Sequence, residues 1–380
     1  MDAGRAWRRG SLLEPALGLA PEAEFAFVGS LDTMAARVLR RGLAQQRVVL
    51  AERAAGNPKA TCFALEHDAP IPELRDGTVL VKNRFVAVEP AMKGWISNVV
   101  NYASVPTGST MFAFGVGEVV ASALDGVEPG AVVAGRTGWQ EYGVADPREP
   151  MFRVVDDAGD GVPLSTSLGV LGINGLTAYL ALHKLGRPQA GETVLCSTAA
   201  GSVGSAVGQL AKRAGCRTVG IAGGAEKVQL CTAAFGYDAA VDYKAHDDLG
   251  AAVAAACPDG VDVFYDMVGG ATLDAVLPLL NVGARVAIVG TAGTAAWDPP
   301  PTGLRPERNV LVKRATLSGF LVFDHASEFP AALEDLSAMV KDGSLAYREE
   351  IRTGLASAPQ ALEELYEGKN LGKMIIDLGE

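Results

Sequence analysis

The stretch Thr193-Val-Leu-Cys-Ser-Thr-Ala-Ala-Gly201-Ser-Val-Gly204-Ser-Ala-Val-Gly208 decides the fold class of this chain. It opens with an apolar run typical of a buried strand, and a glycine-rich turn leads into a helix predicted over residues 203–214. The dinucleotide-binding fingerprint G-x-G-x-x-G occupies such a turn, and here Ala199 stands at the first glycine position. Gly201 lets the backbone approach a pyrophosphate, and Gly204 lets the helix pack closely on the strand. The free N–H groups at the helix start attract phosphates, so the stretch predicts a dinucleotide site.

Strands and helices alternate on both sides of this stretch. The predicted helices cover residues 176–185, 226–235, 249–256 and 272–280, and the predicted strands cover 193–196, 218–221, 240–243, 261–265 and 285–289. Strict alternation is typical of βαβ units that build a parallel sheet with helices on both faces. We therefore predict an α/β fold with a Rossmann parallel-sheet domain over residues 166–325.

The residues before this domain follow a different pattern. Short apolar runs at 78–81, 85–88, 114–120 and 131–134 are separated by turn pairs such as Asp76-Gly77 and Pro129-Gly130. We expect a small barrel or folded sheet over residues 46–165. Residues 349–380 have the pattern strand, helix, strand, so we expect 326–380 to return to this first domain. Residues 1–45 fit neither a transit peptide nor a secretory signal, and we expect a poorly ordered N-terminal extension.

The composition of the chain argues against several classes of binding partner. A chain of 380 residues suggests two domains, and its net charge of −11 disfavours binding to nucleic acid. No apolar run reaches the roughly 20 residues that cross a bilayer, so we expect no membrane association. The five cysteines and four histidines are scattered, which predicts no metal site and no disulfide framework. We expect reduced thiols and a cytoplasmic protein.

The strand at 218–221 indicates which dinucleotide is bound. An NAD site usually has an acidic residue near the end of this second strand, where it bonds the ribose hydroxyls. Here the strand ends in Ala222-Gly223-Gly224, and Lys227 follows. The glycines leave room for a 2′-phosphate, and the lysine can neutralise it, so we predict NADPH.

Seven segments together resemble one known family. They are Gly172-Ile-Asn-Gly-Leu-Thr-Ala-Tyr179, Ala199-Ala-Gly-Ser-Val-Gly-Ser205, Gly223-Gly-Ala-Glu-Lys227, Asp242-Tyr-Lys244, Tyr265-Asp-Met-Val-Gly-Gly270, Gly319-Phe-Leu-Val322 and Gly368-Lys-Asn-Leu-Gly-Lys373. From about residue 47 onward, the chain resembles the zinc-free medium-chain dehydrogenase/reductase superfamily, in the branch of prostaglandin reductases and alkenal double-bond reductases. The resemblance implies a GroES-like β-barrel domain beside the Rossmann domain, with the cofactor between them.

The resemblance also implies roles for individual residues. Gly223, Lys227 and Tyr243 should surround the 2′-phosphate, while Phe320 to Val322, Gly290 and Thr291 should line the nicotinamide. The full set of predicted cofactor-binding residues is Asn174, Thr177, Ala200, Gly201, Val203, Gly204, Gly223, Gly224, Lys227, Tyr243, Val268, Gly290, Thr291, Phe320, Leu321, Val322, Asn370 and Gly372.

The chain departs from the family pattern on the substrate side. Where the branch has Asp-Pro-Tyr-Met-Arg, this chain has Glu89-Pro-Ala-Met-Lys93, and a second family tyrosine is missing from the segment after Val289. Tyr102 matches a tyrosine of many members, and we predict it as the catalytic hydroxyl. The predicted substrate pocket consists of Trp95, Tyr102, Phe112, Phe114 and Trp297. Since Ala91 and Ala295 replace bulkier residues, we expect a pocket that is wider and less polar than is usual in the branch.

The resemblance implies NADPH-dependent reduction of the C=C bond of α,β-unsaturated ketones or aldehydes. A quinone reductase is an alternative with the same fold and cofactor. A cofactor-binding regulatory protein with little catalysis is an alternative of another class, because the phosphate-binding positions are kept while substrate-side hydroxyls are lost. By analogy with the family we expect a homodimer, which pairs through the apolar strand near 316–322.

Overall fold

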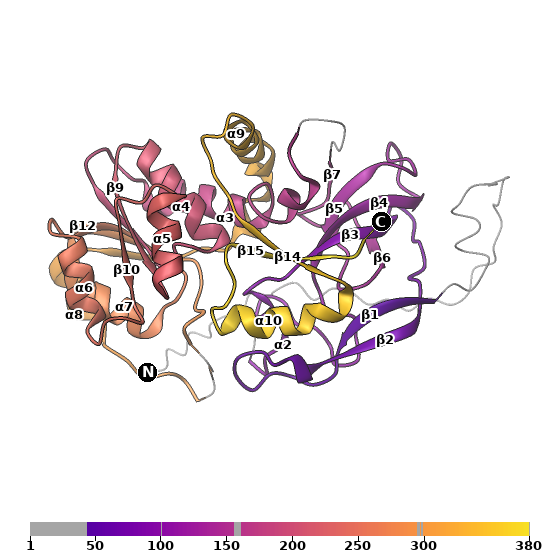
Figure 1. The fold of residues 1–380 in the computed structure, drawn as a ribbon, viewed down its shortest axis with the longest axis horizontal. Coiled ribbons are helices and arrows are strands. Elements are labelled where there is room, and N and C mark those ends of the chain that lie inside the picture. The colour runs from indigo at the N-terminus through magenta and orange to yellow at the C-terminus, as the bar shows by residue number, and fades with distance from the viewer. Residues whose placement is uncertain (1–43, 100, 156–160, 295–296, 298, 380) are drawn as a thin grey trace, which may run out of the picture.

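The computed structural model describes residues 44–99, 101–155, 161–294, 297 and 299–379 (Figure 1). Most of the predicted N-terminal extension lies outside these residues, and so does Ala295. Its last two positions, Ala44 and Gln45, instead begin strand β1 (Ala44–Leu50). Gln45 is 1% exposed, and its amide donates to the carbonyl of Pro70 at 3.2 Å and to Oε1 of Gln140 at 3.2 Å. These partners are distant in sequence, so the local pattern placed the boundary two residues too late.

The predicted parallel sheet is present. Its strands are β8 (Thr193–Cys196), β9 (Arg217–Ala222), β10 (Ala239–Asp242), β11 (Val261–Asp266), β12 (Leu280–Ile288) and β13 (Thr316–Gly319). They lie in the order β10-β9-β8-β11-β12-β13, and every neighbouring pair is parallel. Counted along the chain this is the order 3-2-1-4-5-6 of a Rossmann fold, which confirms the predicted fold class.

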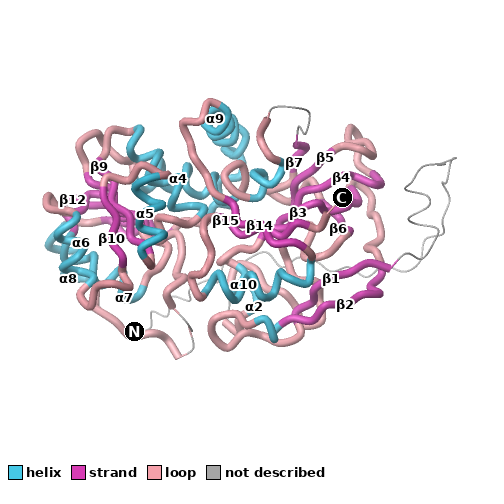
Figure 2. Tube along the Cα trace, in the orientation of Figure 1, coloured by secondary structure: helices cyan, strands magenta, loops and turns pink. Residues whose placement is uncertain are grey.

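Alternate residues of β8 pack on opposite faces of this sheet. Val194 and Cys196 join a core with α3 (Ile173–Ala181), α4 (Ser202–Arg213) and α5 (Ala225–Ala233). Leu195 joins a second core with α6 (Leu249–Ala256) and α7 (Gly270–Val276). The strand is therefore buried on both sides, as its uninterrupted apolar run predicted. Figure 2 shows α4, α5, α6 and α7 gathered around the strands at one end of the molecule.

A second, mixed sheet forms the other end of the molecule. Its strands are β3 (Val79–Ala87), β4 (Phe114–Ser122), β5 (Val132–Arg136), β6 (Tyr142–Ala145), β7 (Arg153–Val155), β14 (Glu349–Thr353) and β15 (Lys373–Asp377). Strand β3 is central, because it pairs with β4, β15 and β6. The hairpin of β1 and β2 (Phe63–Pro70) attaches through bridges at Arg47 and Val49.

Our prediction of two separate strands at 78–81 and 85–88 is wrong, since β3 is continuous. The polar residues between the two apolar runs resemble a turn, but Asn83 is 2% exposed within the strand. Its amide donates to the carbonyl of Gln140 at 2.8 Å, and its Oδ1 accepts from the hydroxyl of Thr137 at 2.7 Å. A polar residue is therefore tolerated in the middle of a buried strand.

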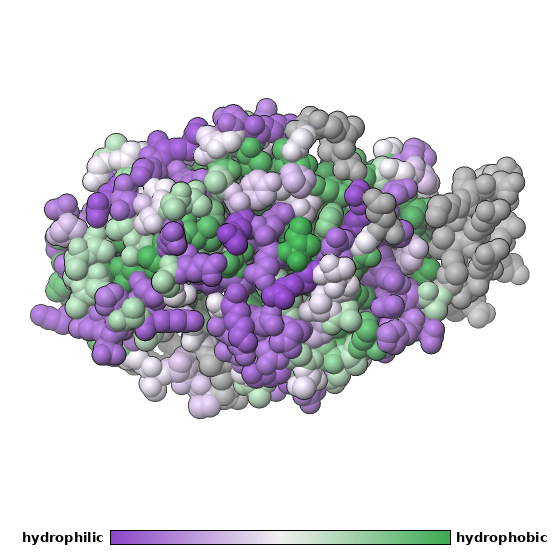
Figure 3. All heavy atoms as spheres, in the orientation of Figure 1, coloured by the Kyte–Doolittle hydropathy of each residue, from purple (hydrophilic) through white to green (hydrophobic). Residues whose placement is uncertain are grey.

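Helix α9 (Phe329–Lys341) joins the two cores. Phe329 and Ala332 pack in the core of the mixed sheet, and Leu336 and Met339 pack in the core beside α4. In the view of Figure 3, hydrophilic side chains cover much of the described surface between smaller hydrophobic patches. No helix in the described ranges is long and apolar enough to span a membrane.

Candidate cofactor and substrate site

The turn after β8 has the geometry that its glycines predicted. Thr198 has a positive φ of 49°, and its carbonyl accepts from the backbone N–H of Gly201 at 2.8 Å. A Cβ atom on Gly204 would lie 2.4 Å from the Thr198 oxygen and 2.8 Å from the Cα of Ala199. Helix α4 thus begins directly against the turn, which only a glycine at 204 permits. Its first free N–H groups lie where a pyrophosphate is expected.

The loops that follow β11 and β12 form the next side of the candidate cofactor site. Asp266 is fully buried, and its carboxylate accepts from the N–H groups of Val268 at 2.9 Å and Gly269 at 3.1 Å. Desolvation by burial raises the pKa of Asp266, although these bonds oppose the shift. A Cβ atom on Gly290 would lie 2.9 Å from the carbonyl oxygen of Met267. Two loops that carry predicted cofactor residues are therefore packed against each other, and Asp266, which the prediction omitted, organises one of them.

Two lysines converge beyond the end of β9. A Cβ atom on Gly368 would lie 3.9 Å from the Nζ atoms of both Lys227 and Lys244. Within the described residues, neither ammonium group has a hydrogen bond or ion pair. Burial, and next the nearby Lys244, lower the pKa of Lys227. The carboxylates of Glu350 and Glu226 partly oppose this shift without forming an ion pair with the ammonium group. Two cations held together in this way favour an anionic ligand. Lys244 was missed as a site residue, although it follows Tyr243 in a segment that carries the family resemblance.

The carboxylate of Asp242 joins the two turns that carry these lysines. The Asp242 Oδ1 atom accepts from the N–H of Gly224 at 2.8 Å and from the N–H of Lys244 at 2.9 Å. Gly224 has a φ of 96°, which favours glycine. A Cβ atom on Gly223 would lie 2.6 Å from the Tyr243 ring, which remains 48% exposed. No acid ends β9, as predicted, and the nearby acid on β10 is engaged with backbone N–H groups.

Three predicted polar contacts have other partners in the structure. The Asn174 amide donates to Glu89 at 3.1 Å, the Thr177 hydroxyl donates to the carbonyl of Ile173 at 2.6 Å, and the Asn370 amide donates to the carbonyl of Gly372 at 2.9 Å. Asn174 Oδ1 is buried and has no partner among the described residues. The cofactor roles of these residues stay predictions.

The predicted nicotinamide segment leaves the end of β13. The N–H of Phe320 donates to the carbonyl of Ile288 at 3.0 Å, so the segment continues the line of the sheet. The Phe320 ring stacks on His325, with centroids 5.0 Å apart and planes 8° apart. Val322 is 5% exposed and packs in the core of the mixed sheet. The segment therefore passes from one domain to the other.

The structure brings together some of the predicted substrate-pocket residues. Ring centroids of Trp95 and Phe114 are 6.4 Å apart, and Phe323 lies 6.3 Å from Phe114 and 6.4 Å from Tyr102. We call these four rings the aromatic cluster. Phe323 was missed, although it directly follows the predicted nicotinamide segment.

The other two pocket residues face cations. The guanidinium carbon of Arg136 lies 4.7 Å from the centroid of Phe112, and the Lys93 Nζ atom lies 5.1 Å from that of Trp297. Lys93 is 2% exposed, and its ammonium also donates to Asn57 Oδ1 at 3.0 Å and to the carbonyl of Thr294. Burial lowers the pKa of Lys93. Lys93 thus joins helix α2 (Met92–Ile96) to the loop that follows β12.

Across the described ranges, no three His, Cys, Asp or Glu side chains are grouped so that they could hold a metal ion. All five cysteines are buried free thiols.

Comparisons with known proteins agree with this geometry. A family model described as the N-terminal domain of oxidoreductase matches residues 46–153, and a model described as zinc-binding dehydrogenase matches residues 202–338. The chain is 38% identical to an NADPH-dependent curcumin reductase of Escherichia coli strain K12 over 339 residues, which cover 87% of this chain and 96% of the relative. It is 36% identical to an NADP⁺-dependent 2-alkenal reductase of Nicotiana tabacum over 338 residues, which cover 88% and 97% of the two chains. The crystal structure of CurA from Vibrio vulnificus in complex with NADPH superposes with a TM-score of 0.82 at 35% identity and covers 88% of this chain and 99% of that one.

Proposed function

This chain belongs to the zinc-free medium-chain dehydrogenase/reductase superfamily, and from that membership we propose that it reduces the C=C bond of α,β-unsaturated ketones or aldehydes with NADPH. The observation that carries the choice of cofactor is the convergence of Lys227 and Lys244 at Gly368. The relatives named as curcumin and alkenal reductases support the choice of reaction.

The residues present fit NADPH. The turn at Gly201 and Gly204 leaves room for a pyrophosphate at the start of α4, and the two lysines can neutralise a 2′-phosphate. When bound, NADPH supplies a hydride to the β-carbon, the C=C electron pair moves toward the carbonyl oxygen, and a proton adds to the α-carbon to leave NADP⁺ and the saturated carbonyl compound. We propose that the predicted cofactor residues line this site, with Lys244 added. We also propose the division into residues 44–165 with 326–380, and residues 166–325.

The aromatic cluster supports an apolar substrate. Trp95 and Phe114 are 4% and 7% exposed, whereas Tyr102 is 53% exposed. The protein contributes a water-poor surface for the carbon skeleton, with Tyr102 at its rim. Burial of the hydroxyl raises the pKa of Tyr102, and Tyr102 is our candidate for the proton donor.

A substrate panel tests the proposal. NADPH oxidation is measured with enones, enals and quinones, and each product is identified by mass spectrometry. We expect saturated ketones or aldehydes from the first two classes. Turnover of quinones alone would favour the quinone reductase, and no turnover despite tight NADPH binding would favour the regulatory protein.

We propose a homodimer that pairs along β13. This strand bonds β12 on one side and lies at the edge of the sheet. Nearby, α8 (Glu307–Lys313) has no buried residue, and Leu311 is 73% exposed. Uncovered apolar edges favour pairing with a second copy. Light scattering at micromolar concentration should give twice the mass of one chain, and the mass of a single chain would contradict the proposal.

We also propose that the protein works in the cytoplasm, where its buried thiols stay reduced.

A further inference from the structure

His325 supports the ring of Phe320 from one side. The two rings are nearly parallel, with planes 8° apart and centroids 5.0 Å apart. Phe320 also packs against the cores of both domains, and its N–H donates to the carbonyl of Ile288 at 3.0 Å. The sheet therefore fixes the backbone of Phe320, and the imidazole of His325 covers one face of its ring.

A kink in the chain brings the imidazole to this ring. His325 lies in the short helix η5 (Val322–Glu328), and its backbone (φ −117°, ψ 22°) departs from the helical conformation. Just before the kink, the N–H of Asp324 donates to the carbonyl of Leu321 at 3.2 Å, which closes a turn. The chain thus turns directly after the proposed nicotinamide segment, and the side chain of His325 meets a ring of that segment.

Two charged side chains hold the imidazole in place. His325 Nδ1 lies 3.4 Å from Glu328 Oε1, and the same oxygen lies 2.8 Å from Nζ of Lys184. Lys184 belongs to helix η3 (Leu182–Gly186), which is far from Glu328 in sequence. The hydrogen bond from Lys184 is the main cause that lowers the pKa of Glu328. The imidazole is therefore held between the Phe320 ring and a carboxylate that stays charged.

The proposed nicotinamide segment borders open space. A Cβ atom on Gly319 would meet no other atom within 4 Å, and Gly319 is exposed. This space lies at the carboxyl end of β13, and ligands of open α/β sheets bind at the carboxyl ends of the strands. A ligand in this space would lie beside a ring whose position is already set by His325.

We propose that His325 is a positioning residue for hydride transfer, because its imidazole holds the Phe320 ring and that ring holds the nicotinamide against the substrate. The lysines that converge at Gly368 supply affinity for the 2′-phosphate, whereas His325 sets the geometry at the other end of the cofactor. Reaction rates depend steeply on such geometry, since a displacement of about 1 Å can cost 10²-fold. The inference rests on the proposed function.

The variant His325→Ala removes the imidazole. Its side chain is 28% exposed, so we expect the variant to fold, and a melting curve checks this. In a single turnover at saturating NADPH and enone, we expect hydride transfer to slow about tenfold. The Kd for NADPH should stay nearly constant. An unchanged rate of hydride transfer, or a rise in Kd as large as the loss of rate, would overturn the proposal.

Two further variants separate stacking from other effects. His325→Phe keeps a ring beside Phe320 without the ion pair, so it should recover most of the rate. A His325→Phe variant as slow as His325→Ala would overturn the stacking role. The matched control His183→Ala removes an imidazole that lies 4.3 Å from the ring of Tyr179, outside the proposed nicotinamide segment. It should transfer hydride at the wild-type rate, and an equal loss in this control would contradict a specific role of His325.

A second measurement does not depend on turnover. Bound NADPH emits more strongly when its dihydronicotinamide ring is held rigidly. At saturating NADPH without substrate, we expect weaker emission from His325→Ala than from the wild type, His325→Phe and His183→Ala. Equal emission from His325→Ala and the wild type would overturn the inference. If the wild type reduces no enone, the proposed function is wrong, and this emission alone then decides whether His325 positions the nicotinamide.

Discussion

Lys373 and Glu89 form an ion pair with side chains only 4% and 5% exposed. Lys373 begins β15, and Glu89 follows β3, so the pair fastens the C-terminal strand to the first domain. The ammonium of Lys373 also donates to the carbonyl of Val88 at 3.0 Å, and Glu89 accepts from Asn174 on α3 at 3.1 Å. Burial lowers the pKa of Lys373, and Glu89 opposes this shift. The three side chains join elements that are far apart in sequence.

Breaking this pair should destabilise the protein strongly. Lys373→Met leaves the Glu89 carboxylate buried without its cation, which typically costs about 3–5 kcal/mol. The double variant Glu89→Gln, Lys373→Met removes both charges and should recover much of this loss. Urea denaturation of the wild type, the two single variants and the double variant measures the coupling free energy between Glu89 and Lys373. Equal denaturation midpoints for wild type and Lys373→Met would contradict this account.

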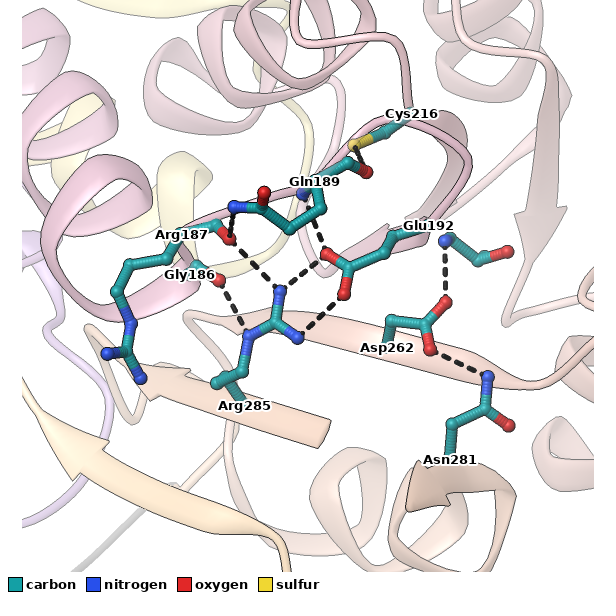
Figure 4. Close-up of polar contacts among 9 residues, drawn as sticks. Gly186, Arg187, Gln189, Glu192, Cys216, Asp262, Asn281 and Arg285 are labelled. Carbon is teal, nitrogen blue, oxygen red and sulfur yellow. Dashed lines mark hydrogen bonds and ion pairs between the residues drawn. The ribbon is translucent and has the colours of Figure 1, made fainter. Parts of the chain in front are cut away.

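A second ion pair, between Arg285 and Glu192, lies beside the first strand of the parallel sheet. Figure 4 shows the Arg285 guanidinium between the Glu192 carboxylate and the carbonyls of Gly186 and Arg187. Its nitrogen atoms lie 2.5 Å and 2.8 Å from the two Glu192 oxygens. The bond from Arg285 lowers the pKa of Glu192.

This pair should make stability fall in acid. The pKa of Glu192 is lower in the folded than in the unfolded state. The ion pair therefore contributes fully to the free energy of unfolding above the unfolded pKa of about 4.3. It is lost as the pH falls through the folded pKa. The urea midpoint of Glu192→Gln should lie below that of the wild type at pH 7, and the difference should shrink in acid. A difference that is constant with pH would contradict the assignment.

The lysine pair should select NADPH. Lys244→Ala and Lys227→Ala each remove one charge-assisted contact, worth about 1.5–3 kcal/mol, so the Kd for NADPH should rise roughly 10- to 100-fold. The Kd for NADH, which lacks the 2′-phosphate, should stay nearly constant. Titration by cofactor fluorescence measures both constants. Lys212→Ala is a suitable control, since its ammonium pairs with Asp238 at 2.9 Å. Parallel losses for both cofactors would argue against a 2′-phosphate site.

Tyr102→Phe tests the proton donor. If the hydroxyl supplies the proton, turnover should fall about tenfold or more, because general acids contribute roughly 10²–10⁴-fold. Steady-state rates with several enones provide the measurement. Unchanged turnover would leave the proton to water or to the cofactor ribose.

Short-range patterns predicted the Rossmann domain because each βαβ unit is specified locally. The apolar run before Gly201 and the glycine spacing set strand, turn and helix, and the close approach of Gly204 to Thr198 follows from them. Long-range pairing could not be predicted in this way. Asn83 is interior only because Thr137 and Gln140 meet it from the loop between β5 and β6.

Transfer of deuterium from cofactor to substrate tests the central claim most directly. The wild type is incubated with an enone and NADPH that carries deuterium at the transferable position of the nicotinamide, and the product is examined by NMR. The account predicts a saturated ketone with one deuterium on the β-carbon and a solvent-derived hydrogen on the α-carbon. Deuterium on the carbonyl carbon of an allylic alcohol, or no incorporation while NADPH stays bound, would contradict it.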